Sequence, residues 1–177
     1  MGNLSNVLTN ILRAIKILRE QKNIDIDVIF SGSPEGNLRY ILDKAKEFRI
    51  DDLIHHIGFV SNEEIPSLYK QSLSLVMPTY LGPTNIPPLE AFAYETPVCY
   101  SDIPSFREQV GDAVFFIDLK DPNSLVKSIL TIQTDKQTLK EKKEKGQQVL
   151  KNWNEEDFYK KLSNVFNEFK YVRELWK

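Results

Sequence analysis

A loop followed by a helix, at residues 80–93, carries the residue types best suited to bind an anion. This segment reads Tyr-Leu-Gly-Pro-Thr-Asn-Ile-Pro-Pro-Leu-Glu-Ala-Phe-Ala. Proline has no N–H and a fixed φ, so Pro88 suits the first turn of a helix and Pro87 stiffens the approach to it. The main-chain donors of the segment therefore lie just before the two prolines.

Three neighbouring amides, those of Thr84, Asn85 and Ile86, remain as donors. Gly82 permits close approach of the backbone to a ligand, and the hydroxyl of Thr84 adds a further polar contact. A rigid, neutral cradle of this kind fits a phosphate. Each preorganised donor to a developing oxyanion lowers a reaction barrier by roughly 3 to 4 kcal/mol. We therefore expect these residues to bind a phosphate group.

Glu90 follows about one turn into the helix. At that position a carboxylate can cap main-chain N–H groups, or it can accept hydrogen bonds from paired hydroxyls such as those of a ribose. Spacing alone leaves both roles open.

Apolar runs alternate with helical patterns along the chain, and this alternation predicts the elements that position these residues. Five apolar runs are predicted strands, at residues 28–30, 53–59, 73–77, 97–100 and 113–117. The pattern predicts an α/β fold, a Rossmann-like open parallel sheet of about five strands with helices on both faces. Such a sheet normally opens with a strand, whereas this sequence opens with a helix, so we expect a further strand upstream.

In an open parallel sheet, ligands bind beyond the carboxyl ends of the strands, where helices begin. We call this edge the ligand rim. The loops expected to form it are residues 31–35, 60–61, 78–88, 101–104 and 118–121. The anion-binding segment therefore belongs to this rim.

Four segments in order carry a family resemblance: Pro-Thr-Tyr-Leu-Gly-Pro-Thr-Asn-Ile-Pro-Pro-Leu-Glu-Ala, Pro-Val-Cys-Tyr-Ser-Asp-Ile-Pro, Arg-Glu-Gln-Val-Gly-Asp-Ala and Asp-Pro-Asn-Ser-Leu, all between Met77 and Leu125. This run resembles the donor-binding domain of group 1 (family 4) glycosyltransferases of the GT-B fold. Weaker matches at residues 29–33 and 57–69 extend the resemblance over nearly the whole chain.

The resemblance implies a retaining sugar transfer from a nucleotide diphosphate sugar, with no essential metal and no other cofactor. In the family, the second glutamate of a paired motif binds the nucleotide ribose, and Glu90 matches it. The first glutamate, which faces the donor sugar, falls on Gly82, so that contact differs here. Thr84, Asn85 and Ile86 fall on the segment whose backbone holds sugar and phosphate.

Two other loops receive roles from the same resemblance. Gly32 and Ser33 match a turn beside the donor, and Val60 with Ser61 matches the edge near the base. No residue of this chain is assigned as catalytic.

Two parts of the family's pattern are missing from the chain. The family's first strand ends in an arginine or lysine loop that grips the diphosphate, and this sequence begins just beyond it. The N-terminal acceptor domain is absent too. The resemblance thus implies that residues 1–177 form a single C-terminal nucleotide-sugar-binding domain that is inactive alone. Its terminal helix, at residues 153–177, either crosses to the missing domain or packs within the chain.

Composition excludes several other classes of protein. Acidic residues number 25 and basic residues 23, so the net charge of −2 favours no nucleic-acid partner. A lone cysteine excludes an internal disulfide and favours a reducing compartment. No apolar run reaches the roughly 18 to 20 residues that span a bilayer. We expect a cytoplasmic protein, with any membrane contact of the full-length enzyme peripheral, through the missing domain at the inner face of the plasma membrane.

Other candidate sites are weaker than the ligand rim. Asp25 and Asp27 have the spacing by which another glycosyltransferase fold holds a divalent cation, but they open a predicted strand at the opposite rim. His55 and His56 are adjacent in a strand and face opposite sides, so they cannot chelate one metal together. Cys99 lies in a predicted buried strand with no base nearby in sequence, which indicates a core residue.

Three functions follow from these observations. The resemblance favours the donor-binding half of a bacterial hexosyltransferase that builds a cell-envelope polysaccharide, with a nucleotide diphosphate sugar as its ligand. A nucleotide-sugar epimerase of GT-B-like shape needs acid–base carboxylates and histidines in the cleft, and we expect no histidine on the ligand rim. A non-catalytic nucleotide-binding module is consistent with Gly82 in place of the usual glutamate.

Overall fold

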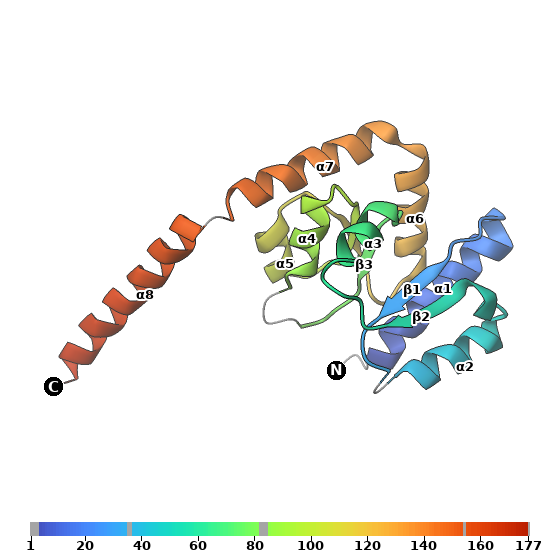
Figure 1. Cartoon of the computed structure of the whole chain (residues 1–177), viewed down its shortest axis with the longest axis horizontal. Helices are drawn as coiled ribbons and strands as arrows, with labels where there is room; N and C mark the ends of the chain where they lie inside the picture. The colour runs from blue at the N-terminus through green and yellow to red at the C-terminus, as the bar shows by residue number, and fades with distance from the viewer. Residues whose placement is uncertain (1–3, 35–36, 82–84, 154, 177) are drawn as a thin grey trace.

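Helices and parallel strands alternate along the chain, and a long C-terminal helix extends from them (Figure 1). The computed structural model describes residues 4–34, 37–81, 85–153 and 155–176. Within these residues the strands are β1 (Val28–Ser31), β2 (Ile54–Gly58), β3 (Leu75–Met77), β4 (Val98–Ser101) and β5 (Phe115–Ile117). The α helices are α1 (Leu4–Lys22), α2 (Leu38–Phe48), α3 (Ile65–Gln71), α4 (Pro87–Ala93), α5 (Pro104–Val110), α6 (Pro122–Thr134), α7 (Lys136–Lys151) and α8 (Glu155–Leu175), and a 3-10 turn, η1 (Asp51–Leu53), precedes β2.

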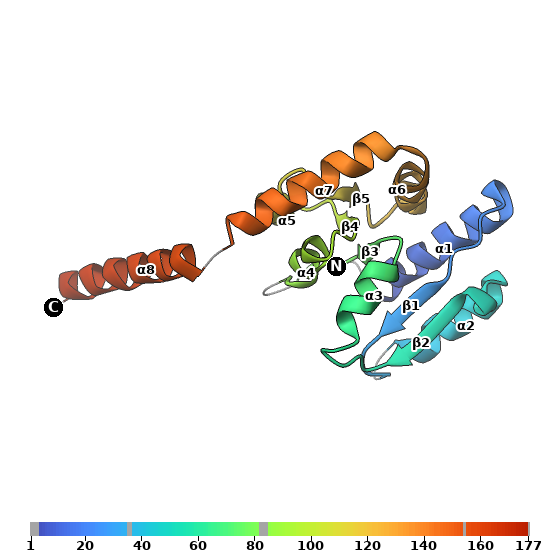
Figure 2. The same cartoon turned by 45° about the horizontal axis from the view of Figure 1, so that its top comes forward.

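Every strand pair is parallel, so the predicted parallel α/β fold is confirmed. The structure differs from the predicted single sheet in how the strands are grouped. β1 pairs with β2, β3 pairs with β4 and β4 pairs with β5, which gives a two-stranded and a three-stranded sheet. β1 and β3 are not hydrogen-bonded to each other, although β1 lies between β2 and β3 in both views (Figures 1 and 2).

Two hydrophobic cores lie on opposite faces of the strands. The first contains buried residues of α1, α2, α6 and the facing sides of β2, β4 and β5. The second contains buried residues of α4, α5 and the other side of β4. Cys99 belongs to the first core, whereas Val98 and Tyr100 belong to the second, so β4 is covered on both faces. Because both faces of β4 are covered, all of its residues are buried and none needs to be polar.

Local capping chemistry determines where several helices begin. Asp121 caps α6 by accepting from the amide of Asn123 at 2.9 Å, with Pro122 in the first turn. Before α3, the carboxylate of Glu64 accepts from both the amide and the hydroxyl of Ser61, at 3.0 and 2.7 Å. Glu64 therefore reaches back to Ser61, whose hydroxyl donates to the carboxylate instead of capping a helix amide.

α8 extends away from the rest of the chain (Figures 1 and 2). Its aromatic side chains are exposed, among them Phe158 at 63%, Phe166 at 64% and Phe169 at 65%. Neither core includes a residue of α8. The interpretation that these aromatics pack within the chain is therefore wrong for the described residues. The other interpretation, that they cover a surface of a further domain, stays a prediction.

Candidate functional site

The turn after β1 is held by two contacts from β2. Gly32 has φ +118°, a conformation that glycine adopts far more readily than other residues. Its amide donates to the carbonyl of Gly58 at 2.7 Å. Its own carbonyl lies 3.0 Å from Nε2 of His56, so the imidazole N–H on Nε2 is the donor. Ser33 follows this turn and is exposed. The predicted Gly32–Ser33 turn is thus rigidly attached to the end of β2.

The sequence analysis did not predict the contact between His56 and the Gly32 turn. Its expectation that no histidine lies on the ligand rim is therefore wrong. The parallel register places His56 opposite Phe30, two residues before Gly32. His55 faces the other side, where its Nε2 lies 2.7 Å from a carboxylate oxygen of Asp27. The two histidines therefore do not form a common site, as the strand geometry predicts.

The start of α4 carries the predicted anion-binding amides. Asn85 is 7% exposed and has φ +44°, and its carbonyl accepts from Nε2 of Gln109 at 3.1 Å. The hydroxyl of the fully buried Tyr100 donates to Oε1 of the same glutamine at 3.2 Å. Gln109 thus joins the buried strand β4 to the loop that precedes α4. This link holds the unusual backbone conformation of Asn85 in place.

Ile86 is 48% exposed and stands at the N-cap of α4. Its carbonyl accepts from the amides of Leu89 and Glu90, at 2.8 and 3.1 Å, so the helix begins at Pro87 and both prolines lie in its first turn. Within the described part of the chain, no protein acceptor pairs with the amide of Ile86 or of Asn85. That these two amides bind an anion stays a prediction. Gly82 and Thr84, the other residues predicted here, lie outside the described residues.

Glu90 accepts a hydrogen bond from the hydroxyl of Tyr69, which lies 3.0 Å from Oε2. Tyr69 belongs to α3, and its ring stacks on Tyr94 with centroids 5.6 Å apart. Burial and the neighbouring Glu90 carboxylate raise the pKa of the Tyr69 hydroxyl well above its usual value, so it stays protonated as a donor. A carboxylate has about four acceptor positions, and the tyrosine uses one of them. Glu90 is therefore oriented by a side chain and can accept further hydroxyl groups.

The loop after β2 is a weaker candidate for direct side-chain contacts. Val60 is half-buried, and Ser61 is exposed. The amide and hydroxyl of Ser61 already donate to Glu64, and its carbonyl accepts from the amides of Glu64 and Ile65. A ligand near this loop would therefore meet Val60 before any polar group of Ser61.

The predicted residues thus form two groups on the ligand rim. Gly32 is joined to β2, and Asn85, Ile86 and Glu90 are joined to α3 and α5. Among the described residues, no hydrogen bond joins one group to the other. Tyr69 and Gln109 are positioning residues that the sequence analysis missed, because each lies on a helix far along the chain from the residue that it contacts.

The competing sites have structural explanations. Arg19 donates to the carboxylate of Asp25 and to that of Asp52. Asp27 pairs with His55. The two aspartates before β1, Asp25 and Asp27, therefore already have partners. In the part of the chain that the structure describes, no group of three or more histidine, cysteine or acidic side chains is arranged for a metal ion. Burial raises the pKa of the Cys99 thiol to about 12, which keeps it protonated within the core.

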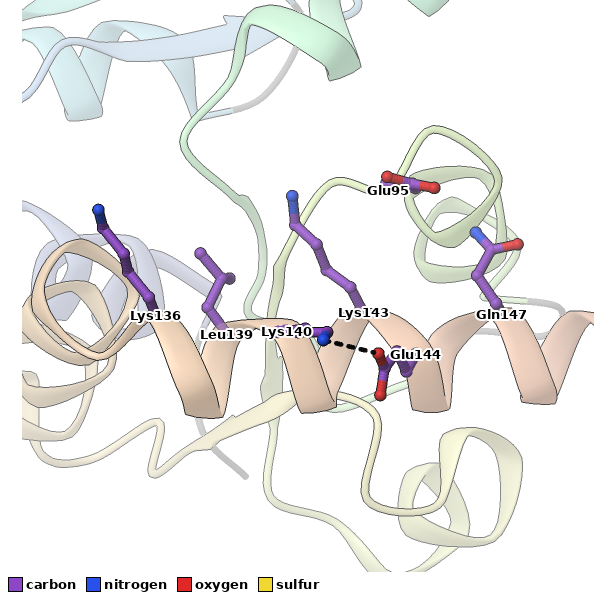
Figure 3. A pocket seen from close by; sticks show the side chains of 7 residues that line it. All are labelled: Glu95, Lys136, Leu139, Lys140, Lys143, Glu144 and Gln147. Atoms are coloured by element: carbon purple, nitrogen blue, oxygen red, sulfur yellow. Dashed lines mark ion pairs between the residues drawn. The ribbon is translucent and has the colours of Figure 1, made fainter.

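A hollow of about 300 Å³ lies between α7 and the turn after α4 (Figure 3). Its lining residues are Glu95, Lys136, Leu139, Lys140, Lys143, Glu144 and Gln147. Glu95 follows the carboxyl end of α4, whereas the predicted donor amides precede its amino end. No predicted site residue lines this hollow, and its lysines and glutamates mix both charges along α7.

Parallel strands that alternate with helices define this chain as an α/β domain. The family model of glycosyl transferases group 1 matches residues 5–149. The chain belongs to this family. The resemblance stated from the four sequence segments is thereby confirmed.

Two of the curated relatives are O-antigen chain mannosyltransferases. The O-antigen chain mannosyltransferase B of Escherichia coli is 26% identical over 129 residues, covering 72% of this chain and 34% of that protein. The O-antigen chain mannosyltransferase RfbU of Salmonella typhimurium is 32% identical over 87 residues, covering 49% of this chain and 25% of that protein. The chain therefore spans about a quarter to a third of the length of these relatives.

Solved structures show the same fold. HepE from Anabaena, in complex with UDP and glucose, superposes with a TM-score of 0.74 at 15% identity, covering 90% of this chain and 44% of that one. The C-terminal domain of the group 1 glycosyl transferase LpcC from Francisella tularensis superposes with a TM-score of 0.67 at 20% identity, covering 86% of this chain and 81% of that one. The fold is therefore that of a GT-B C-terminal domain. Within the described residues, no helix has the length and apolar character needed to cross a bilayer.

Proposed function

We propose that this chain is the donor-binding half of a retaining glycosyltransferase that moves a sugar from a nucleotide diphosphate sugar to an acceptor. The main support for the proposal is the arrangement of polar groups at the start of α4. Two neighbouring main-chain amides, of Asn85 and Ile86, precede a helix whose first turn presents a carboxylate already oriented by Tyr69. The segment lies inside the region that the group 1 family model matches.

In this proposal each group has a defined task at the donor. The amides of Asn85 and Ile86, with Thr84 before them, donate to the diphosphate and stabilise the charge that grows on it as the glycosidic bond breaks. Glu90 accepts from the two ribose hydroxyls, and Tyr69 holds its carboxylate in position. The chain supplies main-chain donors here instead of a metal, so we expect binding that does not require a divalent cation.

The remaining predicted residues surround the donor. Gly32 and Ser33 form a turn beside it, and Val60 with Ser61 forms the edge near the base. Gly82 occupies the place where the family presents a glutamate to the sugar, so the sugar lacks that carboxylate contact. We expect weaker discrimination among donor sugars as a consequence, because a site without a hydrogen-bonding partner cannot reject an analogue that lacks the hydroxyl.

The names of the relatives favour a role in cell-envelope polysaccharide synthesis. Two of them are O-antigen mannosyltransferases, and a structural relative holds UDP with glucose. We propose that the full-length enzyme works on a lipid-linked acceptor at the inner face of the plasma membrane. The acceptor would be bound by an N-terminal domain, and this chain alone would show no transfer.

A titration of this chain with UDP, GDP and ADP tests the donor site directly. Binding is followed by amide NMR shifts or by thermal unfolding, first with each nucleotide and then with its sugar conjugates. Free ligand at 100 times the dissociation constant raises the free energy of unfolding by about 2.7 kcal/mol. We expect the amide signals of Asn85 and Ile86 to shift with one of the nucleotides and to shift equally with a chelator present.

A titration in which no nucleotide moves these signals would contradict donor binding by the isolated chain. The corresponding test of transfer uses this chain joined to an N-terminal domain of the family. Transfer of labelled sugar by the two-domain protein supports the proposal. A two-domain protein that binds the nucleotide but transfers no sugar would favour the non-catalytic alternative.

A further inference from the structure

The hollow between α7 and the turn after α4 is a concave surface that lies apart from the ligand rim (Figure 3). The proposed donor amides precede the amino end of α4, whereas Glu95 of the hollow follows its carboxyl end. The hollow extends along α7 from Lys136 to Gln147, and its volume of about 300 Å³ lies at the lower end of the range for small-molecule pockets. A ligand of the size of a monosaccharide derivative therefore fits it.

Lysines give this part of the surface a positive charge, although the chain as a whole is acidic. α7 contains six lysines and two glutamates, a net charge of +4, against −2 for the whole chain. On one side of the helix, Lys142 and Lys145 pair with Asp112. Three other lysines line the hollow, namely Lys136, Lys140 and Lys143. A concave surface lined mainly by one sign of charge concentrates the electrostatic potential and attracts an ion of the opposite sign.

Two of the three lysines in the hollow have no counter-ion. Lys140 lies 3.8 Å from a carboxylate oxygen of Glu144. Among the described residues, no carboxylate lies within ion-pair distance of Lys136 or Lys143, and Lys143 is half-buried. Both side chains point from α7 toward the side on which Glu95 lies (Figure 3). Their ammonium groups are therefore available to an anion from solution.

The other end of the hollow carries hydrogen-bond acceptors. Glu95 lies across from α7, at the same end of the hollow as Gln147 (Figure 3). Nε2 of Gln147 donates to the carbonyl of Phe92 at 2.6 Å, which orients the side-chain amide and leaves its oxygen as an acceptor. Carboxylate and amide oxygens accept hydrogen bonds from hydroxyl groups. This end of the hollow therefore suits the hydroxyl groups of a sugar.

We propose that this hollow binds a phosphorylated sugar, with its phosphate against Lys140 and Lys143 and its hydroxyl groups against Glu95 and Gln147. Lysine binds phosphate as a point charge, and two lysines three residues apart share one face of a helix. Lys143 and Gln147 are four residues apart, which is about 6 Å along the helix axis and close to the width of a pyranose ring. The half-buried Leu139 adds an apolar contact beside them.

This proposal does not depend on donor binding, because the two sites lie at opposite ends of α4. An NMR titration of the chain with glucose 6-phosphate tests it, with glucose and inorganic phosphate titrated separately at the same ionic strength. We expect glucose 6-phosphate to shift the amide signals of Glu95, Lys143 and Gln147 to saturation. We expect glucose and phosphate each to bind at least about tenfold more weakly, because each makes only half of the contacts. The amide signals of Asn85 and Ile86 should not move.

A pair of lysine variants shows whether the hollow itself binds the ligand. We expect Lys143→Gln to weaken the binding of glucose 6-phosphate at least about fivefold. Lys127→Gln is the matched control and leaves binding unchanged, because this exposed lysine of α6 does not line the hollow. The amide spectra of both variants without ligand show whether the fold is retained.

Three results would overturn the proposal. Equal affinity for inorganic phosphate and glucose 6-phosphate would reduce the hollow to a general attraction for anions. Unchanged affinity of Lys143→Gln would place the ligand elsewhere, as would shifts confined to Asn85 and Ile86. The absence of any saturable shift with glucose 6-phosphate would exclude the site, and the nucleotide titration of the donor site would keep its own outcome.

Discussion

Glu90 is the side chain whose charge the proposed donor site depends on. Replacement of Glu90 by glutamine keeps its size but removes the carboxylate that Tyr69 donates to and that is proposed to accept from the ribose hydroxyls. A hydrogen bond to a charged group contributes about 1.5 to 3 kcal/mol, so we expect roughly 10- to 100-fold weaker nucleotide binding. Isothermal titration measures this change.

Tyr69→Phe is the matched variant for this prediction, since it leaves the carboxylate but removes the hydroxyl that orients it. We expect Tyr69→Phe to weaken binding less than Glu90→Gln. Equal affinity of Glu90→Gln and the unaltered chain would show that Glu90 does not contact the nucleotide.

Gln109 joins two buried groups that have no other partner in the described structure. Replacement by alanine leaves the carbonyl of Asn85 and the hydroxyl of Tyr100 without this partner. An unsatisfied buried polar group costs about 1 to 3 kcal/mol, so we expect Gln109→Ala to lower the free energy of unfolding by that amount. Urea unfolding followed by circular dichroism measures it.

The surface glutamine Gln137 offers a matched control, because its amide donates to Glu141 on the same exposed helix face. We expect Gln137→Ala to change the free energy of unfolding by less than about 0.5 kcal/mol. Equal effects of the two substitutions would show that the Gln109 link does not hold the loop.

At the level of the elements, α7 packs closely on α4 at Gly146. A Cβ atom at this position would lie 2.7 Å from Cδ1 of Phe92, which is closer than carbon atoms approach. Alanine favours a helix over glycine by about 1 kcal/mol, but overpacking of a core costs about 1 to 3 kcal/mol. We therefore expect Gly146→Ala to destabilise the domain in thermal unfolding.

The double variant Gly146→Ala with Phe92→Leu separates the two effects, since leucine makes room for the added methyl group. We expect the double variant to lose less free energy of unfolding than the sum of the losses in the two single variants. A single Gly146→Ala variant that is more stable than the unaltered chain would show that α7 can shift away from α4.

Asp112 ties α7 to the turn before β5. Lys145 and Lys142 donate to its carboxylate at 2.6 and 3.0 Å, and these hydrogen bonds lower the pKa of Asp112 below its usual value. A lowered carboxyl pKa stabilises the fold above the usual pKa near about 4, and the stabilisation is lost as the pH falls through the lowered value. The Asp112 side chain is largely exposed, so the contribution of these ion pairs is at most about 1 kcal/mol.

We therefore expect Asp112→Asn to be less stable than the unaltered chain at pH 7 and equally stable at a pH below the lowered pKa of Asp112. Urea unfolding at both pH values measures the difference. Lys140→Gln, which breaks the exposed pair of Lys140 with Glu144 on the same helix, is the control and has little effect at either pH. A difference for Asp112→Asn that persists at low pH would assign its effect to packing.

For the molecule as a whole, none of the described side chains of α8 is part of either core. A chain that ends at Trp153 should therefore unfold at nearly the same temperature as the full chain. Exposed apolar surface of this extent promotes association, so the full chain should also self-associate more readily than the shortened one. Differential scanning calorimetry and analytical ultracentrifugation measure the two effects. A large loss of thermal stability on removing α8 would show that it packs against the domain.

The alternation of elements was predictable because it depends on chemistry within a few residues. Apolar runs, prolines and capping side chains identify strands and helix starts, as at Asp121 before α6. The parallel class followed from the same alternation. The proposal that the amides of Asn85 and Ile86 bind an anion also comes from local sequence, since the two prolines that follow leave few other donors.

The partners of the site residues were decided by the tertiary structure. Tyr69 and Glu90 are 21 residues apart, and Gln109 and Asn85 are 24 apart, as are His56 and Gly32. A crossover between parallel strands brings such residues together, and its geometry is not contained in either local sequence. The grouping of the strands and the exposure of α8 have the same origin. Both depend on which surfaces find a partner, and that is a property of the folded chain as a whole.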